Sequence, residues 1–262
     1  MTAPKPIVLV TGASAGLGAA LAAAFAAKGH QTVLVARRQA QLAEVADAIA
    51  AGGHPRPHVI ALDLAAPDAG DRLARALHEA AFEPAIVVNN AGFGLLGPAV
   101  NLDRDRQLAM IELNVRIATD LSLRFVESLE RHKGGILNVA SVLGFVPGPG
   151  MAVYHATKAY LLSFSEALHH ELKPRGIRVT VLCPGPVDTE FGIRPAGFFS
   201  RRLLRPMEHV VRHGLAGFLA GEPVVIPGRD NKVLSVLPRI LPRGAILSML
   251  AASKRQRFET SP

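Results

Sequence analysis

The stretch Thr11-Gly12-Ala13-Ser14-Ala15-Gly16-Leu17-Gly18 decides the fold of this chain, because it joins a short apolar run to an alanine-rich segment. Ile7–Val10 before it reads as a buried strand, and Leu17–Ala27 after it has helical character. Glycines permit a sharp turn and a close approach of the backbone to phosphate, and a helix N-terminus offers free N–H groups to an anion. The stretch therefore predicts a strand–turn–helix unit that binds a dinucleotide pyrophosphate. The residues expected to line it are Gly12, Ser14, Ala15, Gly16, Leu17 and Gly18.

Apolar runs of this kind alternate with helical patterns along most of the chain. The expected strands are Ile7–Val10, Thr32–Ala36, Val59–Leu62, Ala85–Val88, Ile136–Val139, Val179–Leu182 and Val224–Ile226. The expected helices between them are Leu17–Ala27, Gln39–Ala51, Ala69–Ala81, Arg106–Arg131 and Tyr154–Lys173. Strands that alternate with helices predict a parallel sheet covered on both faces. We therefore expect an α/β fold, a Rossmann-like doubly wound parallel sheet of about seven strands, in a single domain over 1–262.

Composition and charge restrict the function classes. With 49% hydrophobic and 19% charged residues, the chain can bury a full core, which excludes disordered and fibrous classes. A single cysteine, Cys183, excludes an intramolecular disulfide and a multi-cysteine zinc site. The net charge of +8 is concentrated in residues 200–262, where 11 Lys/Arg stand against 4 Asp/Glu. This placement argues against nucleic-acid binding and is compatible with an anionic surface or ligand. We expect a cytoplasmic protein.

The second expected strand ends at Arg37 and Arg38. In NAD-binding units of this kind, an acidic residue at this position binds the ribose 2′-hydroxyl. A guanidinium group instead suits a phosphate dianion, which a carboxylate would repel. The two arginines therefore predict NADP(H) over NAD(H). Asp63 after the third strand and Asn90-Ala91-Gly92 after the fourth stand at carboxyl ends of strands, where adenine and ribose would lie.

The most specific pattern is Tyr154-His155-Ala156-Thr157-Lys158, which places a phenol and an ammonium group on one helical face. A nearby cation favours the phenolate, so we expect the pKa of Tyr154 to be lowered towards neutrality. Such a phenol can donate a proton to a carbonyl oxygen or accept one from an alcohol.

Two further polar residues fit the same chemistry. Ser141 ends the fifth expected strand, where its hydroxyl could bind a substrate oxygen. Asn114 is unfavourable within the expected helix Arg106–Arg131, and we interpret it as holding a water that relays protons to Lys158. Serine hydrolase chemistry is disfavoured, and the side chains of the adjacent histidines 169 and 170 point in directions too different for a shared metal site.

With these motifs, the chain resembles the short-chain dehydrogenases/reductases over residues 6–192, in the branch with Thr-Gly-x-x-x-Gly-x-Gly and Tyr-x-x-x-Lys. The resemblance implies a catalytic tetrad of Asn114, Ser141, Tyr154 and Lys158. It implies cofactor contacts from the glycine turn and from Arg37, Arg38, Asp63, Leu64, Asn90, Ala91, Gly92, Tyr154, Lys158, Pro184, Gly185, Val187 and Thr189. The last four follow the sixth strand, where Val187 and Thr189 would face the nicotinamide carboxamide. It also implies a homodimer or homotetramer paired through the two longest helices.

The resemblance implies a carbonyl or alcohol substrate that is a small molecule. The expected walls of its pocket are mostly apolar and comprise Phe93, Leu95, Val142, Leu143, Phe145, Met151, His155 and Gly192–Phe199, within a covering segment at 193–215. The basic, apolar tail 229–262 has three interpretations: it packs on the sheet, on a second subunit, or on anionic lipid as an interfacial element. A non-catalytic NADP(H)-binding sensor or membrane-associated module remains the alternative function.

Overall fold

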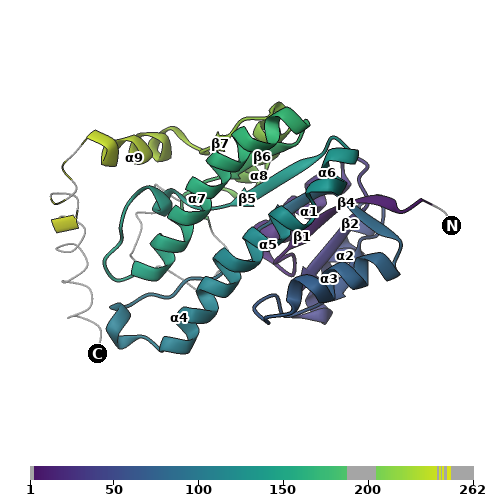
Figure 1. The fold of residues 1–262 in the computed structure, drawn as a ribbon, viewed down its shortest axis with the longest axis horizontal. Helices are drawn as coiled ribbons and strands as arrows, with labels where there is room; N and C mark the ends of the chain where they lie inside the picture. Colours follow the sequence, from purple (N-terminus) through teal and green to yellow (C-terminus); the bar gives the residue numbers. More distant parts are fainter. Residues whose placement is uncertain (1–2, 188–204, 241, 243, 245–246, 249–262) are drawn as a thin grey trace.

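The structure, a computed structural model, describes residues 3–187, 205–240, 242, 244 and 247–248. The strands are β1 (Lys5–Thr11), β2 (Thr32–Ala36), β3 (His58–Ala61), β4 (Phe82–Asn89), β5 (Gly135–Val139), β6 (Arg178–Leu182) and β7 (Val224–Val225). They form one parallel sheet in the order β3-β2-β1-β4-β5-β6-β7, which runs through the middle of the molecule (Figure 1). The predicted doubly wound parallel sheet of seven strands is confirmed.

Helices cover both faces of this sheet. The α-helices are α1 (Gly16–Ala26), α2 (Gln39–Ala51), α3 (Ala69–Glu79), α4 (Arg104–Ile111), α5 (Ile117–Arg124), α6 (Val126–Arg131), α7 (Ala152–Leu172), α8 (Met207–Ala220) and α9 (Arg229–Ile240). Short helical turns are η1 (Ala99–Asn101), η2 (Glu112–Arg116), η3 (Val142–Phe145) and η4 (Lys173–Arg175). Side chains of α1, α2 and α8 fill the core on one face, and those of α3, α5 and α7 fill it on the other. The described part of the chain contains no helix with the length and hydropathy that a membrane span requires.

The helical character predicted for Arg106–Arg131 is confirmed, but the helix is interrupted. The chain there forms α4, a π-helical turn at η2, α5 and α6, with Phe125 between the last two. Asn114 lies in the π turn, and its side chain bonds the backbone of Phe93, which holds the helix against the loop after β4. Phe125 itself has φ −102° and ψ 13°, outside the helical region, which separates α5 from α6.

The register of the sheet places the predicted site residues together beyond the carboxyl ends of the strands. Thr11 of β1 pairs with Val35 of β2, so the glycine turn emerges beside the arginines that follow β2. Val139 of β5 pairs with Leu182 of β6, which brings Ser141 beside Pro184. All of these positions lie beyond the carboxyl ends of parallel strands, where ligands bind in open α/β sheets.

Candidate active site

The glycine turn between β1 and α1 fits so closely against the loop after β4 that side chains are excluded. Gly12 has φ +66°, and a Cβ added to it would lie 2.8 Å from Cα of Ala91. A Cβ on Gly18 would overlap Nδ2 of Asn90 and the Gly12 carbonyl oxygen. Asn90 donates from Nδ2 to the carbonyl oxygens of Thr11 at 3.0 Å and Gly12 at 3.2 Å. Its side chain therefore holds the turn in shape.

The start of α1, which follows the glycine turn, has features that favour an anion. Within the described part of the chain, no side chain caps this helix at Ala15, and its first turn carries no acidic residue. Its first N–H groups lack intrahelical acceptors, as at every helix start, and attract an anion. Arg38 donates from Nη2 to Oγ of Ser14 at 3.1 Å, and Arg37 beside it is exposed. The donors and charges present fit the phosphates of a dinucleotide.

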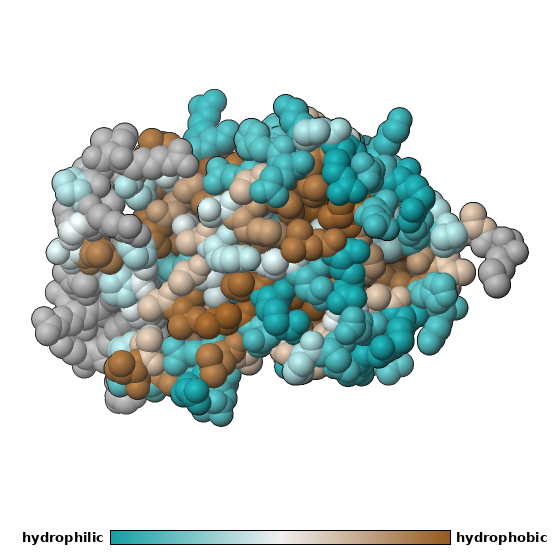
Figure 2. All heavy atoms as spheres, viewed as in Figure 1, coloured by the Kyte–Doolittle hydropathy of each residue, from teal (hydrophilic) through white to brown (hydrophobic). Residues whose placement is uncertain are grey.

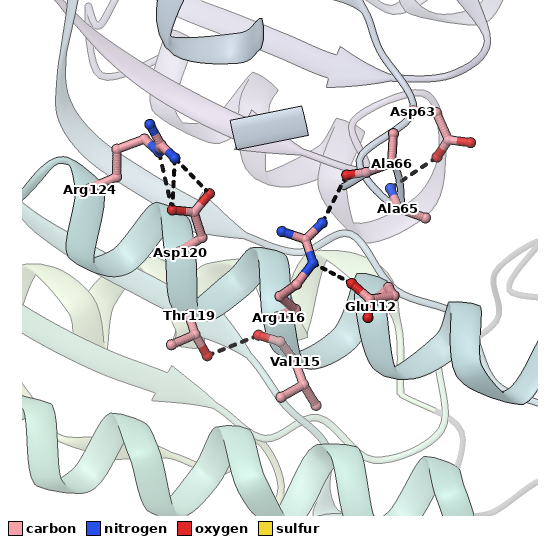
Figure 3. Close-up of polar contacts among 9 residues, drawn as sticks. All are labelled: Asp63, Ala65, Ala66, Glu112, Val115, Arg116, Thr119, Asp120 and Arg124. Atoms are coloured by element: carbon pink, nitrogen blue, oxygen red, sulfur yellow. Dashed lines mark hydrogen bonds and ion pairs between the residues drawn. The ribbon is translucent and has the colours of Figure 1, made fainter. Parts of the chain in front are cut away.

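The predicted adenine contacts follow β3. Asp63 is exposed, and its Oδ1 accepts a 3.0 Å hydrogen bond from the N–H of Ala65, while Leu64 is buried. Figure 3 shows that Arg116 fastens this turn to the π turn, since it bonds both Glu112 and the carbonyl oxygen of Ala66. Sequence reasoning missed Arg116, because a charged residue in an expected helix gives no signal of a contact fifty positions away.

Tyr154, Lys158 and Ser141 come together at the start of α7. Tyr154 is buried and shares a hydrogen bond with the Ser141 hydroxyl. Lys158, 4% exposed, donates from Nζ to the carbonyl oxygen of Val139 at 2.8 Å and lies 5.8 Å from the centroid of the Tyr154 ring. Ser141 also caps η3, with Oγ accepting from the N–H of Leu143 at 3.2 Å. A phenol, a hydroxyl and an ammonium group thus lie close together near the carboxyl end of β5.

The expected lowering of the Tyr154 pKa is wrong for the protein alone. Burial raises the pKa of Tyr154 to about 12, and the hydrogen bond from Ser141 offsets only part of this effect. Burial also lowers the pKa of Lys158 to about 8. The physical reason is that the ammonium group bonds a carbonyl and not the phenol, so desolvation outweighs its attraction for a phenolate.

Asn114 lies in the π turn and is 1% exposed. Its Oδ1 accepts from the N–H of Phe93 at 3.1 Å, and its Nδ2 donates to the Phe93 carbonyl at 3.0 Å and to Oγ1 of Thr157 at 3.1 Å. A Cβ on Gly92 would lie 2.8 Å from Oδ1 of Asn114 and 3.6 Å from Nζ of Lys158. The side chain therefore joins the loop after β4 to α7 beside Lys158.

A hollow beside Tyr154 has mostly apolar walls. Its lining comprises Leu95, Gly97, Ala99, Leu102, Gln107, Met110, Met151, Ala152, Val153 and Tyr154. Of the predicted pocket residues, Leu95 and Met151 line it, and Phe93 and Leu143 pack in the same apolar cluster. Val142 is buried in η3, which follows Ser141.

Other predicted pocket residues lie elsewhere. Phe145 packs with a separate cluster that includes Leu161. His155 is buried, with its Nδ1 2.7 Å from the carbonyl oxygen of Val146, so it supports a loop and does not stand at the pocket rim. Thr189, Gly192–Phe199 and the start of the segment 193–215 are outside the described residues, and from Met207 that segment forms α8 in the helical layer beside α1.

The loop after β6 lies next to Ser141 and Val142. The N–H of Val142 donates to the carbonyl oxygen of Pro184 at 3.0 Å, and Oγ of Ser141 lies 3.5 Å from the same oxygen. Gly185 and Val187 follow Pro184 in the same loop.

This geometry has counterparts among known proteins. A family model described as short chain dehydrogenase matches residues 6–194. The chain belongs to the short-chain dehydrogenase family. The membership predicted from the glycine turn and the Tyr-x-x-x-Lys spacing is confirmed.

Relatives within the short-chain dehydrogenase family cover most of this chain. "Sulfoacetaldehyde reductase 2" of Chromohalobacter salexigens is 34% identical over 194 residues, which are 73% of this chain and 76% of that protein. A short-chain dehydrogenase from Sphingobium yanoikuyae, solved in complex with NADPH, is 30% identical, with a TM-score of 0.78 over 98% of this chain and 96% of that one. The bulky-bulky ketone specific alcohol dehydrogenase from Comamonas testosteroni is 27% identical, with a TM-score of 0.74 over 100% and 96% of the two chains.

Proposed function

We propose that the protein is an NADP(H)-dependent oxidoreductase that interconverts a hydrophobic ketone or aldehyde and the corresponding alcohol. The observation that carries the proposal is the hydrogen bond between Tyr154 and Ser141 at the wall of an apolar hollow, with the Lys158 ammonium group 5.8 Å from the ring. A family member solved with NADPH supports the choice of cofactor class.

Each residue of the tetrad has a role in this proposal. Tyr154 donates a proton to the carbonyl oxygen in reduction and accepts it back in oxidation. Ser141 orients that oxygen by a second hydrogen bond. Lys158 favours the phenolate when its own ammonium group is charged and holds the nicotinamide ribose. Asn114 fixes the loop after β4 against α7 and, as the sequence suggests, completes the proton relay. Bound NADP(H) supplies or accepts the hydride.

The nucleotide preference is assigned to the arginines after β2. The glycine turn and the start of α1 would hold the pyrophosphate, and Arg37 and Arg38 would hold the 2′-phosphate. Asp63 and Leu64 would contact the adenine, and Asn90, Ala91 and Gly92 would support the adenosine side. Pro184, Gly185, Val187 and Thr189 would lie against the nicotinamide.

We infer a hydrophobic substrate from the character of the side chains around the hollow beside Tyr154. None of the described residues that line it is charged, and Nε2 of Gln107 donates to the carbonyl oxygens of Ala99 and Leu102. A substrate with an ionised group would lose hydration there without gaining a partner from these residues. The alcohol dehydrogenase named for bulky ketones is therefore a better guide to substrate class than the sulfoacetaldehyde reductase.

The test is a panel of ketones, aldehydes and alcohols that differ in size and charge, followed by NADPH absorbance with NADH in parallel. We expect turnover of uncharged, bulky carbonyl compounds with NADPH. NADPH binding without turnover of any compound would instead favour the non-catalytic sensor.

We also propose that the chain forms a homodimer or homotetramer through α5 and α7. Hydrophobic atoms gather on the surface over these helices (Figure 2). Leu123 of α5 is 52% exposed and Tyr160 of α7 is 42% exposed, although both are large apolar side chains. Burial of such a patch against a second copy stabilises an assembly.

We assign a lipid contact to α9, in a protein that is otherwise cytoplasmic. The helix buries Asn231 and Ser235 and exposes Val233 and Val236, so its apolar stripe faces away from the protein. Lys232 is exposed next to that stripe, in a segment that carries most of the net positive charge. A two-fold contact between copies would bring like charges together, whereas an anionic bilayer complements both properties.

Flotation with vesicles tests this assignment. We expect the chain to float with phosphatidylserine-containing vesicles and not with phosphatidylcholine alone. The Val233→Ser/Val236→Ser variant should remain in the fraction without vesicles. Leu219→Ser, which changes an exposed leucine of α8, should float with them. Equal flotation of all three would dismiss α9 as the contact.

A further inference from the structure

The loop that follows β6 has no regular structure of its own between Cys183 and Pro186. Its position therefore depends on what packs against it. On one side the loop is tied to η3, since Pro184 accepts from the N–H of Val142. On the other side it meets the first turn of α9, which also packs against η3.

Asn231 makes the contact from α9. The residue is 1% exposed, and its Nδ2 donates to the carbonyl oxygen of Pro227 at 2.7 Å. A Cβ on Gly185 would lie 2.6 Å from both Nδ2 and Oδ1 of Asn231. The Asn231 amide therefore packs against the α-carbon of Gly185. A side chain at position 185 would displace either the amide or the loop. A buried amide costs free energy unless its hydrogen bonds are satisfied, so its orientation is fixed by Pro227.

A second contact joins the same turn of α9 to the far end of the loop. Asp230 forms an ion pair with Arg205, with Oδ2 and Nη2 2.5 Å apart. The N–H of Arg205 donates to the carbonyl oxygen of Pro186 at 3.2 Å, and Arg205 forms a parallel bridge with Val187. Two consecutive residues of α9 thus reach the loop: Asn231 directly at Gly185, and Asp230 through Arg205.

We propose that the first turn of α9 is a clasp on residues 184–187, in which Asn231 is a positioning residue for the nicotinamide end of the site. The inference rests on the proposed function, because that function places the nicotinamide against this loop. Small displacements of reacting groups lower rates steeply even when the displaced residue touches no reacting atom. Release of the clasp should therefore lower the rate of hydride transfer while the phosphate contacts, which lie at the other end of the site, keep NADPH bound.

The experiment is a double-variant cycle on the full chain with Gly185→Ala, Asn231→Ala and both together. In Gly185→Ala the new methyl group collides with the Asn231 amide, and in Asn231→Ala the amide that supports the loop is lost. The double variant removes the colliding atoms, so the methyl group fits the vacated space. We expect kcat to fall about tenfold or more in each single variant and to recover in the double variant. The NADPH dissociation constant should change little throughout.

Ser235→Ala is the matched control. Ser235 is also a buried polar residue of α9, but its Oγ donates to the Lys232 carbonyl within the helix. We expect wild-type kcat for this variant at an equal or greater loss of melting temperature. A kcat for Asn231→Ala equal to that of wild type, or no recovery in the double variant, overturns the clasp.

Nicotinamide fluorescence of bound NADPH separates this proposal from the proposed function. If no compound is turned over by the wild type, the proposed function fails. The clasp is then judged on the emission of bound NADPH, which should change in each single variant and return in the double variant. Identical emission from all four proteins overturns it.

Discussion

Nζ of Lys158 lies 5.8 Å from the centroid of the Tyr154 ring, one helical turn away, and donates its hydrogen bond to the backbone of β5. The cation is thus close enough to influence the phenol but is anchored elsewhere. Burial dominates both groups, and it moves the pKa of Tyr154 up to about 12 and that of Lys158 down to about 8. Both shifts are in the direction that favours the neutral form of the group.

These shifts predict that the free energy of unfolding rises as the pH becomes alkaline, and that this rise depends on Lys158. The folded chain releases the Lys158 proton near pH 8 and the unfolded chain near 10.5, so between these values the unfolded state binds more protons and the free energy of unfolding rises with pH. Tyr154 acts in the opposite direction, but only above pH 10, its ordinary pKa. We expect the wild type to gain about 2 to 3 kcal/mol relative to Lys158→Met between about pH 7 and pH 10.

Urea unfolding across this pH range measures the gain. Lys232→Met, which removes an exposed lysine from α9, should follow the wild-type profile. Parallel profiles for wild type and Lys158→Met would show that the ammonium group is not desolvated.

The arginines after β2 should set the preference between nucleotides. We expect Arg37→Ala/Arg38→Ala to raise the dissociation constant of NADPH about 10- to 100-fold, as for loss of charge-assisted hydrogen bonds, and to leave that of NADH nearly unchanged. Arg75→Ala on α3, also an exposed arginine, is the control for a general change in charge. Titration of both nucleotides decides the matter, and an equal loss for the two would assign the arginines to the shared pyrophosphate.

The apolar surface of α5 and α7 should determine the assembly. Leu123→Arg places a charge in the proposed interface, so we expect light scattering to report a smaller mass than for the wild type. Leu219→Arg changes a similarly exposed leucine on α8 and should leave the mass unchanged. A wild-type mass for Leu123→Arg would move the interface to another surface.

The sequence predicted the sheet because buried parallel strands are short, continuous apolar runs, and such runs survive without any tertiary information. It also located Tyr154 and Lys158, since a spacing of four on a helix fixes two side chains on one face. It did not predict the π turn around Asn114, nor the hydrogen bonds from that residue to Phe93, which lies 21 positions away.

Burial accounts for the other differences. The pKa of Tyr154 was predicted from its neighbouring charge, but the desolvation that dominates it depends on how completely α7 is covered. Nothing in the sequence around His155 indicated the contact of its ring with the carbonyl oxygen of Val146. Asn231 appeared as one polar residue in a basic, apolar tail, and its contact with Gly185 arises only when α9 folds back onto the loop after β6.

Replacement of Tyr154 by phenylalanine tests the central claim most directly. The variant keeps the ring in its apolar surroundings and removes only the hydroxyl that would carry the proton. The measurement is kcat for a carbonyl substrate together with the NADPH dissociation constant from fluorescence titration. We predict a loss of about 10²- to 10⁴-fold in kcat with NADPH binding preserved. Turnover close to that of the wild type in a variant that binds NADPH normally would contradict the assignment of Tyr154 as the acid and base.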